Sequence, residues 1–96
     1  MKNPNRQTIT KLQELPNICK AISADLELIG IVEPNNLIGK DPFELYDELC
    51  KKKDQKIDYC VIDVFMSVVD FMEGGDAKVW WAFTAKRKEM LENANN

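Results

Sequence analysis

The chain has 96 residues, of which 45% are hydrophobic, and a formal net charge of −3. This length supports one small hydrophobic core, so we predict a single helical domain over residues 1–96. The chain contains no histidine, which excludes Ser-His and Cys-His nucleophile pairs and most transition-metal sites. Cys19, Cys50 and Cys60 lack CxxC spacing and indicate neither a disulfide framework nor a zinc site. No metal or other cofactor is therefore expected.

Charge is distributed unevenly along the chain. Residues 1–20 carry four basic side chains and one acidic, residues 21–76 five basic and thirteen acidic, and residues 77–96 four basic and two acidic. We therefore expect an anionic partner to meet the two ends of the chain. No apolar run approaches the roughly 18–20 residues that span a bilayer, and the start, MKNPNRQTIT, lacks the apolar segment of a signal peptide. The sequence predicts a cytoplasmic protein without a membrane partner.

A short helix is predicted over residues 8–15. Its apolar side chains are spaced three apart, at Ile9, Leu12 and Leu15. A helix of this length needs support from the rest of the fold. Pro16 ends it, because the residue before a proline is disfavoured in helical conformation.

A second helix is predicted directly after this turn. Asn17 is a favoured N-cap residue, and the following residues, 18–29, place apolar side chains on one face, interrupted only by Asp25. Gly30 follows as the expected C-cap. The stretch LPNICKAISADLELIGI is therefore the end of one helix, a tight turn and a second helix, within about residues 8–30.

Residues 31–40 are predicted to form a loop or a single helical turn. Pro34 and Gly39 interrupt regular structure there. Leu37 and Ile38 are expected to pack this segment against the core.

The next helix is predicted over residues 42–53. Asp41 is placed as its N-cap, Pro42 at its first position, and Glu44 can reach back toward the cap as in a capping box. Its buried residues are expected to be Phe43, Tyr46, Leu49 and Cys50. The three lysines at 51–53 either complement the negative pole of the helix dipole, which we favour, or form a phosphate-binding patch.

A largely apolar helix is predicted over residues 59–73, between a cap at Asp58 and a stop at Gly74. Apolar residues cover most of its circumference, so it is expected to be central in the core or partly covered by a second subunit. Its polar stripe consists of Asp63, Ser67 and Asp70. Paired acids on one face can bind Mg²⁺ or act as acid and base, but no third carboxylate stands at ligand spacing. We therefore predict a solvated stripe.

The last helix is predicted over residues 85–93, with Thr84 as its N-cap. Three aromatic residues come before it and three basic residues lie at its start: Trp80, Trp81, Phe83, Lys86, Arg87 and Lys88. Rings and charges in this order can stack on bases and contact phosphates. The alternative, which we favour, is that the rings close the core while the charges face water.

Four segments together resemble a small bacterial family, the pathogenicity-locus or mitomycin-resistance proteins. They are LPNICKAISADLELIGI, LIGKDPFELYDELC, VIDVFMSVVDFMEGG and WWAFTAKRK. The resemblance runs from about Leu12 to Lys88. It implies an all-α, SAM-domain-like fold of about five short helices without a sheet, with a helix-hairpin-helix unit at its N-terminal end. The family is similar to the C-terminal domain of TfoX-type competence regulators.

The turn of helix-hairpin-helix modules reads Leu-Pro-Gly-hydrophobic-Gly. In this chain Asn17 stands at the first glycine position and Cys19 at the second, where glycine is typical. The resemblance implies that this turn brings backbone N–H groups at the start of the second helix to a DNA phosphate. The residues then expected to contact nucleic acid are Asn17, Ile18, Cys19 and Lys20, assisted by Lys11 or Arg6.

We therefore expect a non-enzymatic protein that binds DNA weakly, without sequence preference, and that needs dimerisation or a partner for useful affinity. The alternative is a dimerising or adaptor module for protein interaction, in which the hairpin is purely structural. An enzyme would have to use Cys60, Asp63 and Asp70, which nothing in the sequence orders into a nucleophile, a base and an oxyanion site. A drug-binding role would need an apolar pocket beside Trp80 and Trp81.

Overall fold

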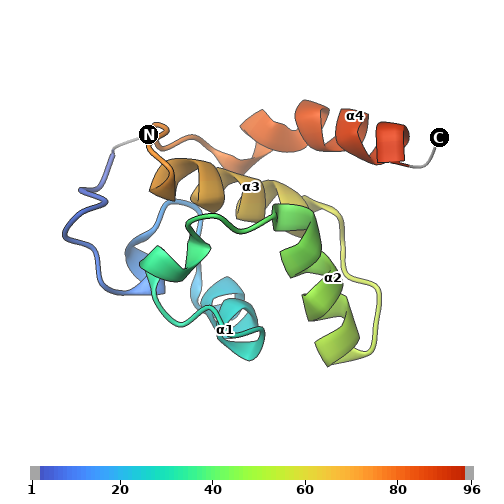
Figure 1. Ribbon diagram of the computed structural model, residues 1–96, viewed down its shortest axis with the longest axis horizontal. Coiled ribbons are helices and arrows are strands. Elements are labelled where there is room, and N and C mark those ends of the chain that lie inside the picture. Colours follow the sequence, from blue (N-terminus) through green and yellow to red (C-terminus); the bar gives the residue numbers. More distant parts are fainter. Residues whose placement is uncertain (1–2, 95–96) are drawn as a thin grey trace.

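The computed structural model describes residues 3–94, which form α-helices and short 3-10 helices and contain no strand (Figure 1). The α-helices are α1 (Lys20–Leu28), α2 (Pro42–Lys53), α3 (Cys60–Met72) and α4 (Thr84–Ala94). The 3-10 helices are η1 (Leu12–Glu14), η2 (Pro34–Leu37) and η3 (Trp80–Phe83). The predicted all-α fold is confirmed.

Helix α3 is the centre of the molecule. In Figure 1 it runs between α4 on one side and α1 with α2 on the other. Ten of its thirteen residues are buried, and Phe65 and Phe71 are completely enclosed. Elements of the same chain therefore cover this apolar helix, so its composition does not require a second subunit.

The start of α2 confirms the predicted cap and first position, although no capping box with Glu44 forms, and Phe43 and Cys50 are only partly buried. The carboxylate of Asp41 accepts a hydrogen bond from the backbone N–H of Phe43 at 2.9 Å, and Pro42 occupies the first helical position. The three C-terminal lysines lie in the last turn, where the helix dipole favours positive charge. One of them, Lys53, forms an ion pair of 2.8 Å with Asp25, which ties α2 to α1.

Helix α3 begins and ends close to the predicted residues. Asp58 accepts a hydrogen bond from the backbone N–H of Cys60 at 2.9 Å. At the other end, Gly74 adopts a φ of +112°, a value that favours glycine, and the N–H of Gly75 donates to the carbonyl of Asp70. The same pattern ends α1, where Gly30 has a φ of +89°.

The predicted first helix, over residues 8–15, is reduced to the single 3-10 turn η1. The Glu14 carboxylate accepts hydrogen bonds from the backbone N–H groups of Thr10 and Lys11, at 3.1 and 2.9 Å. These bonds lower the pKa of Glu14 and hold its two donors in a turn. A spacing of three residues also matches the 3-10 period, in which side chains at i and i+3 align.

Segment 31–40 forms the expected single turn, η2. Leu37 is completely buried, as predicted, but Ile38 is 53% exposed and does not pack against the core. The turn ends at Leu37 with Ile38 in an extended conformation, so consecutive side chains point in different directions.

The predicted solvated stripe on α3 is wrong for two of its three residues. Asp63 is completely buried and Ser67 is 3% exposed, whereas Asp70 is half-buried. Asp63 pairs with Arg87 of α4, with 2.9 Å between Oδ1 and Nε, and accepts a hydrogen bond from the Thr84 hydroxyl at 2.7 Å. Arg87 therefore does not face water, and Thr84 is the first residue of α4 instead of its cap. This buried pair holds α4 on α3.

Candidate nucleic-acid interface

Residues 15–19 form the turn that joins the 3-10 helix η1 to α1, and this turn is called the hairpin below. Leu15 and Ile18 are 4% and 8% exposed and belong to the core. Pro16, between them, is also buried. Because these apolar side chains point inward, the hairpin is anchored on the body of the protein and its backbone is fixed.

Asn17 lies at the tip of the hairpin in a left-handed conformation, with a φ of +67°. Asparagine tolerates this region better than most residues with a side chain, which explains how it replaces the first glycine of the pattern. Its side-chain amide donates to the hydroxyl of Ser67 at 3.0 Å and to the backbone carbonyl of Lys78 at 2.7 Å. The prediction that Asn17 caps the second helix is therefore wrong, because its side chain is committed to other partners.

Cys19 is the N-cap residue of α1, with φ −94° and ψ 175°. Any residue adopts this extended conformation, so the backbone here does not require the glycine that the family pattern contains. Its side chain is exposed, and within residues 3–94 no side chain accepts a hydrogen bond from the first turn of α1. The first backbone donor with an intrahelical partner is Ser23, which bonds to the carbonyl of Cys19 at 3.0 Å.

The start of α1 therefore has free donors on an exposed surface. Lys20 and Ala21 are both exposed, and their backbone N–H groups have no intrahelical partner. The positive end of the helix dipole and the charge of Lys20 act at the same place. This arrangement can accept one anionic oxygen, such as that of a phosphate.

The other two basic residues of the expected site differ in their availability. Lys11 is exposed and precedes η1. Arg6 instead bonds to the carbonyl oxygens of Phe71 and Gly75, at 2.8 and 2.7 Å, and its guanidinium lies 4.9 Å from the centroid of the Phe71 ring. Because Arg6 caps the C-terminal end of α3, it does not assist at the hairpin.

Two residues outside the hairpin were not among the expected contacts. Lys78 is exposed, and its backbone carbonyl holds Asn17. Trp81 is 61% exposed, whereas Trp80 is half-buried against the core. The paired tryptophans were visible in the sequence as an aromatic signal, but Lys78 carries no local signal that would place it beside residue 17.

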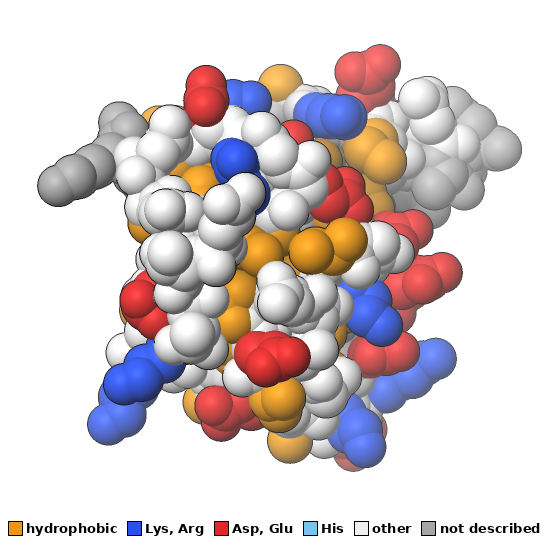
Figure 2. All heavy atoms as spheres, turned by 60° about the vertical axis from the view of Figure 1, so that its left-hand side comes forward, with side chains coloured by type: hydrophobic (Ala, Val, Ile, Leu, Met, Phe, Trp, Pro, Cys, Tyr) orange, Lys and Arg blue, Asp and Glu red, His pale blue; other side chains and the backbone are white. Residues whose placement is uncertain are grey.

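Charge is not concentrated on the face shown in Figure 2. Acidic and basic side chains are interspersed there, and apolar side chains are visible between them. A mixed surface of this kind attracts a polyanion weakly, because attraction and repulsion partly cancel. On this face, affinity for nucleic acid would therefore depend on a few local contacts.

The residues considered for catalysis have different surroundings in the structure. The charge of Asp63 is neutralised by Arg87. Burial raises the pKa of the Cys60 thiol, and its interaction with Asp58 raises it further, which disfavours the nucleophilic thiolate. Asp70 lies 3.8 Å from the ammonium group of Lys78, within a half-exposed pair. In residues 3–94 no cluster of three or more His, Cys, Asp or Glu side chains could hold a metal ion.

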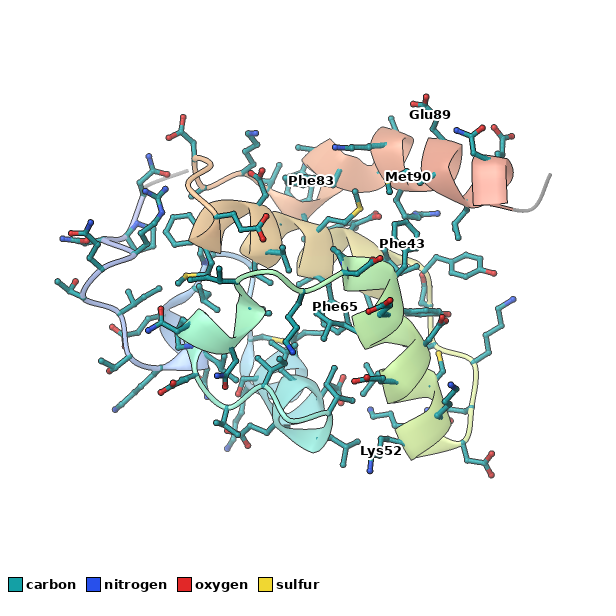
Figure 3. All side chains as sticks on the ribbon, in the orientation of Figure 1. Phe43, Lys52, Phe65, Phe83, Glu89 and Met90 are labelled. Carbon is teal, nitrogen blue, oxygen red and sulfur yellow. The ribbon has the colours of Figure 1, made fainter. Side chains whose placement is uncertain are left out.

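A cleft of about 850 Å³ lies between α2, the segment before α3, and α4. Its apolar walls include Phe43, Tyr46, Tyr59 and Met90, of which Phe43 and Met90 are labelled in Figure 3. The hydroxyl of Tyr46 donates to the carbonyl of Ile57, and burial raises its pKa to about 12. Neither Trp80 nor Trp81 lines this cleft, so it is not the pocket that a drug-binding role was expected to use.

Residues 5–89 match the model of the family described as Cdd1, pathogenicity locus. The chain is also 39% identical over 80 residues to the mitomycin resistance protein McrB of Streptomyces lavendulae, an alignment that covers 83% of this chain and 76% of that protein. No solved structure matches the chain. Within the described residues, no helix is long and apolar enough to cross a membrane.

Proposed function

The chain belongs to the pathogenicity locus family, and for this member we propose a non-enzymatic, cytoplasmic function as a helix-hairpin-helix protein that binds DNA weakly and without sequence preference. The observation that carries this proposal is the uncapped, exposed start of α1 directly after a hairpin anchored in the core. Backbone donors and a helix dipole recognise a phosphate without reading a base, so the contact is independent of sequence.

Lys20 and Lys11 add charge to these backbone donors, because both side chains are exposed. A single hairpin makes few phosphate contacts, so the affinity is expected to be low and strongly dependent on salt. The interspersed charge of the face shown in Figure 2 favours the same conclusion. A second copy or another DNA-binding partner would raise the affinity by avidity.

The test is fluorescence anisotropy of labelled DNA at low and moderate salt, with wild type, Lys20→Glu and Lys52→Glu. Lys52 is a matched control, because it is an exposed lysine at the far end of α2 (Figure 3). We expect Lys20→Glu to weaken binding about tenfold at low salt and to reduce the salt slope by about one. Lys52→Glu should change neither quantity by more than about twofold.

Equal effects of the two substitutions would contradict a site at the hairpin. Cys19→Gly extends the test, because it removes the only exposed side chain of the turn that precedes Lys20. If Cys19→Gly binds DNA and the wild type does not, the native turn lacks the proposed function.

A role in protein interaction is the second candidate. Three large apolar side chains at the end of α1 and in the following loop are exposed: Leu28 at 47%, Val32 at 63% and Ile38 at 53%. Exposed apolar surface of this kind favours contact with another protein chain. This alternative predicts a stable homodimer in light scattering after size-exclusion chromatography. A strictly monomeric protein at high concentration would contradict it.

A further inference from the structure

Trp81 is the largest hydrophobic side chain that residues 3–94 leave exposed, with 61% of its surface accessible. Its indole meets that of Trp80 edge to face, with ring centroids 5.4 Å apart and an interplanar angle of 88°. Trp80 is itself packed against the core. One tryptophan therefore positions the other, and the free ring is held at the surface at little entropic cost.

The segment that carries this ring is bonded to the hairpin. The carbonyl of Lys78 accepts the hydrogen bond from Asn17 at 2.7 Å, and Trp81 follows three residues later. Because an extended chain spans at most about 3.6 Å per residue, the Cα of Trp81 lies within about 11 Å of that of Lys78, and Lys20 is equally close to Asn17. Each span equals about three nucleotides of a stacked strand, which rises about 3.4 Å per nucleotide, so a strand of several nucleotides can reach from the start of α1 to Trp81.

The chemistry around Trp81 suits a nucleic-acid strand. The ammonium group of Lys78 lies 5.6 Å from the centroid of the Phe83 ring, and Phe83 is labelled in Figure 3 between α3 and α4. The pair of Lys78 with Asp70 is long, at 3.8 Å, and half-exposed, so a phosphate can compete for this lysine. The same short segment carries an exposed cation, Lys78, and an exposed indole, and proteins hold unpaired strands with this combination.

We infer that Trp81 stacks on an unpaired base of a DNA strand whose phosphate is held at the start of α1. The preferred ligand is then single-stranded or forked DNA. In a continuous duplex both faces of each base are covered by neighbours, so the indole has no face to contact. Stacking is tolerant of sequence, and it adds affinity that the hairpin alone lacks. This inference rests on the proposed function of the hairpin.

The experiment compares three labelled ligands of equal length: a single strand, a blunt duplex and a fork. Trp81→Ala is expected to weaken binding to the single strand and the fork by about 5- to 100-fold, and to the duplex by less than about twofold. Trp81→Phe should restore most of the lost affinity, because it keeps an aromatic face. Met90→Ala is the matched control, since it truncates an exposed apolar side chain on α4.

The possible outcomes distinguish a failure of the stacking inference from a failure of the proposed function on which it rests. If Trp81→Ala weakens all three ligands equally, or none, while Lys20→Glu still weakens binding, the stacking inference is overturned and the hairpin function stands. If the wild type binds none of the three ligands at low salt, the proposed function fails and the inference fails with it. Circular dichroism of each variant confirms that a loss of affinity is not a loss of fold.

Discussion

Asp63 and Ser67 lie one turn apart on α3, and each holds a different part of the chain. Asp63 holds α4 through a charged pair, in which the side chains of Asp63 and Arg87 are 0% and 11% exposed. Ser67 holds the hairpin through a neutral hydrogen bond from Asn17. A buried charge without its partner costs far more free energy than a missing neutral hydrogen bond. Removing one partner of the Asp63–Arg87 pair is therefore expected to destabilise the protein strongly. Removing the hydrogen bond between Asn17 and Ser67 should destabilise it less.

The first prediction breaks the charged contact. Asp63→Ala leaves Arg87 buried without a partner and is expected to lower the free energy of unfolding by about 3–5 kcal/mol. That is a large part of the roughly 5–15 kcal/mol typical of a domain. Urea denaturation followed by circular dichroism measures the change. The double variant Asp63→Leu with Arg87→Met should recover most of the loss, and failure to recover it would show that the pair contributes more than mutual neutralisation.

The second prediction concerns the neutral hydrogen bonds that the Asn17 side chain donates. Asn17→Ala removes both hydrogen bonds and places alanine at a φ of +67°. We therefore expect the free energy of unfolding to fall by about 2–3 kcal/mol. Asn17→Gly removes the same bonds without the backbone strain, so the free energy of unfolding should fall by only about 1 kcal/mol. Equal losses in the two variants would indicate that the left-handed conformation relaxes after substitution. The same urea titration measures both.

Cys19 lies at the edge of the hairpin, where helix stability and phosphate binding favour different side chains. Cys19→Asp supplies the missing cap of α1 and is expected to stabilise the protein by about 1 kcal/mol. The same carboxylate occupies the free donors and repels phosphate, so DNA binding should fall below the wild-type level. Denaturation and anisotropy on one preparation measure both effects. A variant that is more stable and also binds more tightly would contradict a phosphate site at these donors.

Local signals in the sequence predicted the elements whose ends are set by neighbouring residues. Asp41 and Pro42 placed the start of α2, and Gly30 placed the end of α1, because caps act within a few residues. The apolar circumference of α3 likewise predicted its central position. The prediction of a first helix was wrong because the Glu14 carboxylate accepts a hydrogen bond from the backbone of its own turn. Hydrophobic periodicity cannot show such a bond.

Local sequence patterns could not predict the polar contacts that complete the site. The partners Asp63 and Arg87 are 24 residues apart, and the hydrogen bond from Asn17 to Lys78 joins residues 61 apart. Hydrophobic periodicity assigns a polar residue to the surface unless a partner is known, so the stripe on α3 was predicted as solvated. For the candidate interface, Lys20 and Cys19 stay a prediction from the sequence, which contained no sign that the backbone of Lys78 lies beside Asn17.

The long separations that hold Asn17 also affect the order in which the chain acquires its structure during synthesis. The serine and the carbonyl that bind Asn17 follow it by 50 and 61 residues, so they leave the ribosome long after the hairpin itself. Contacts between distant residues form late in folding, because the intervening chain must first be ordered. A nascent chain that ends after α2 therefore contains the entire hairpin sequence but lacks the groups that fix its tip. The hairpin reaches its final geometry only when the domain is almost complete.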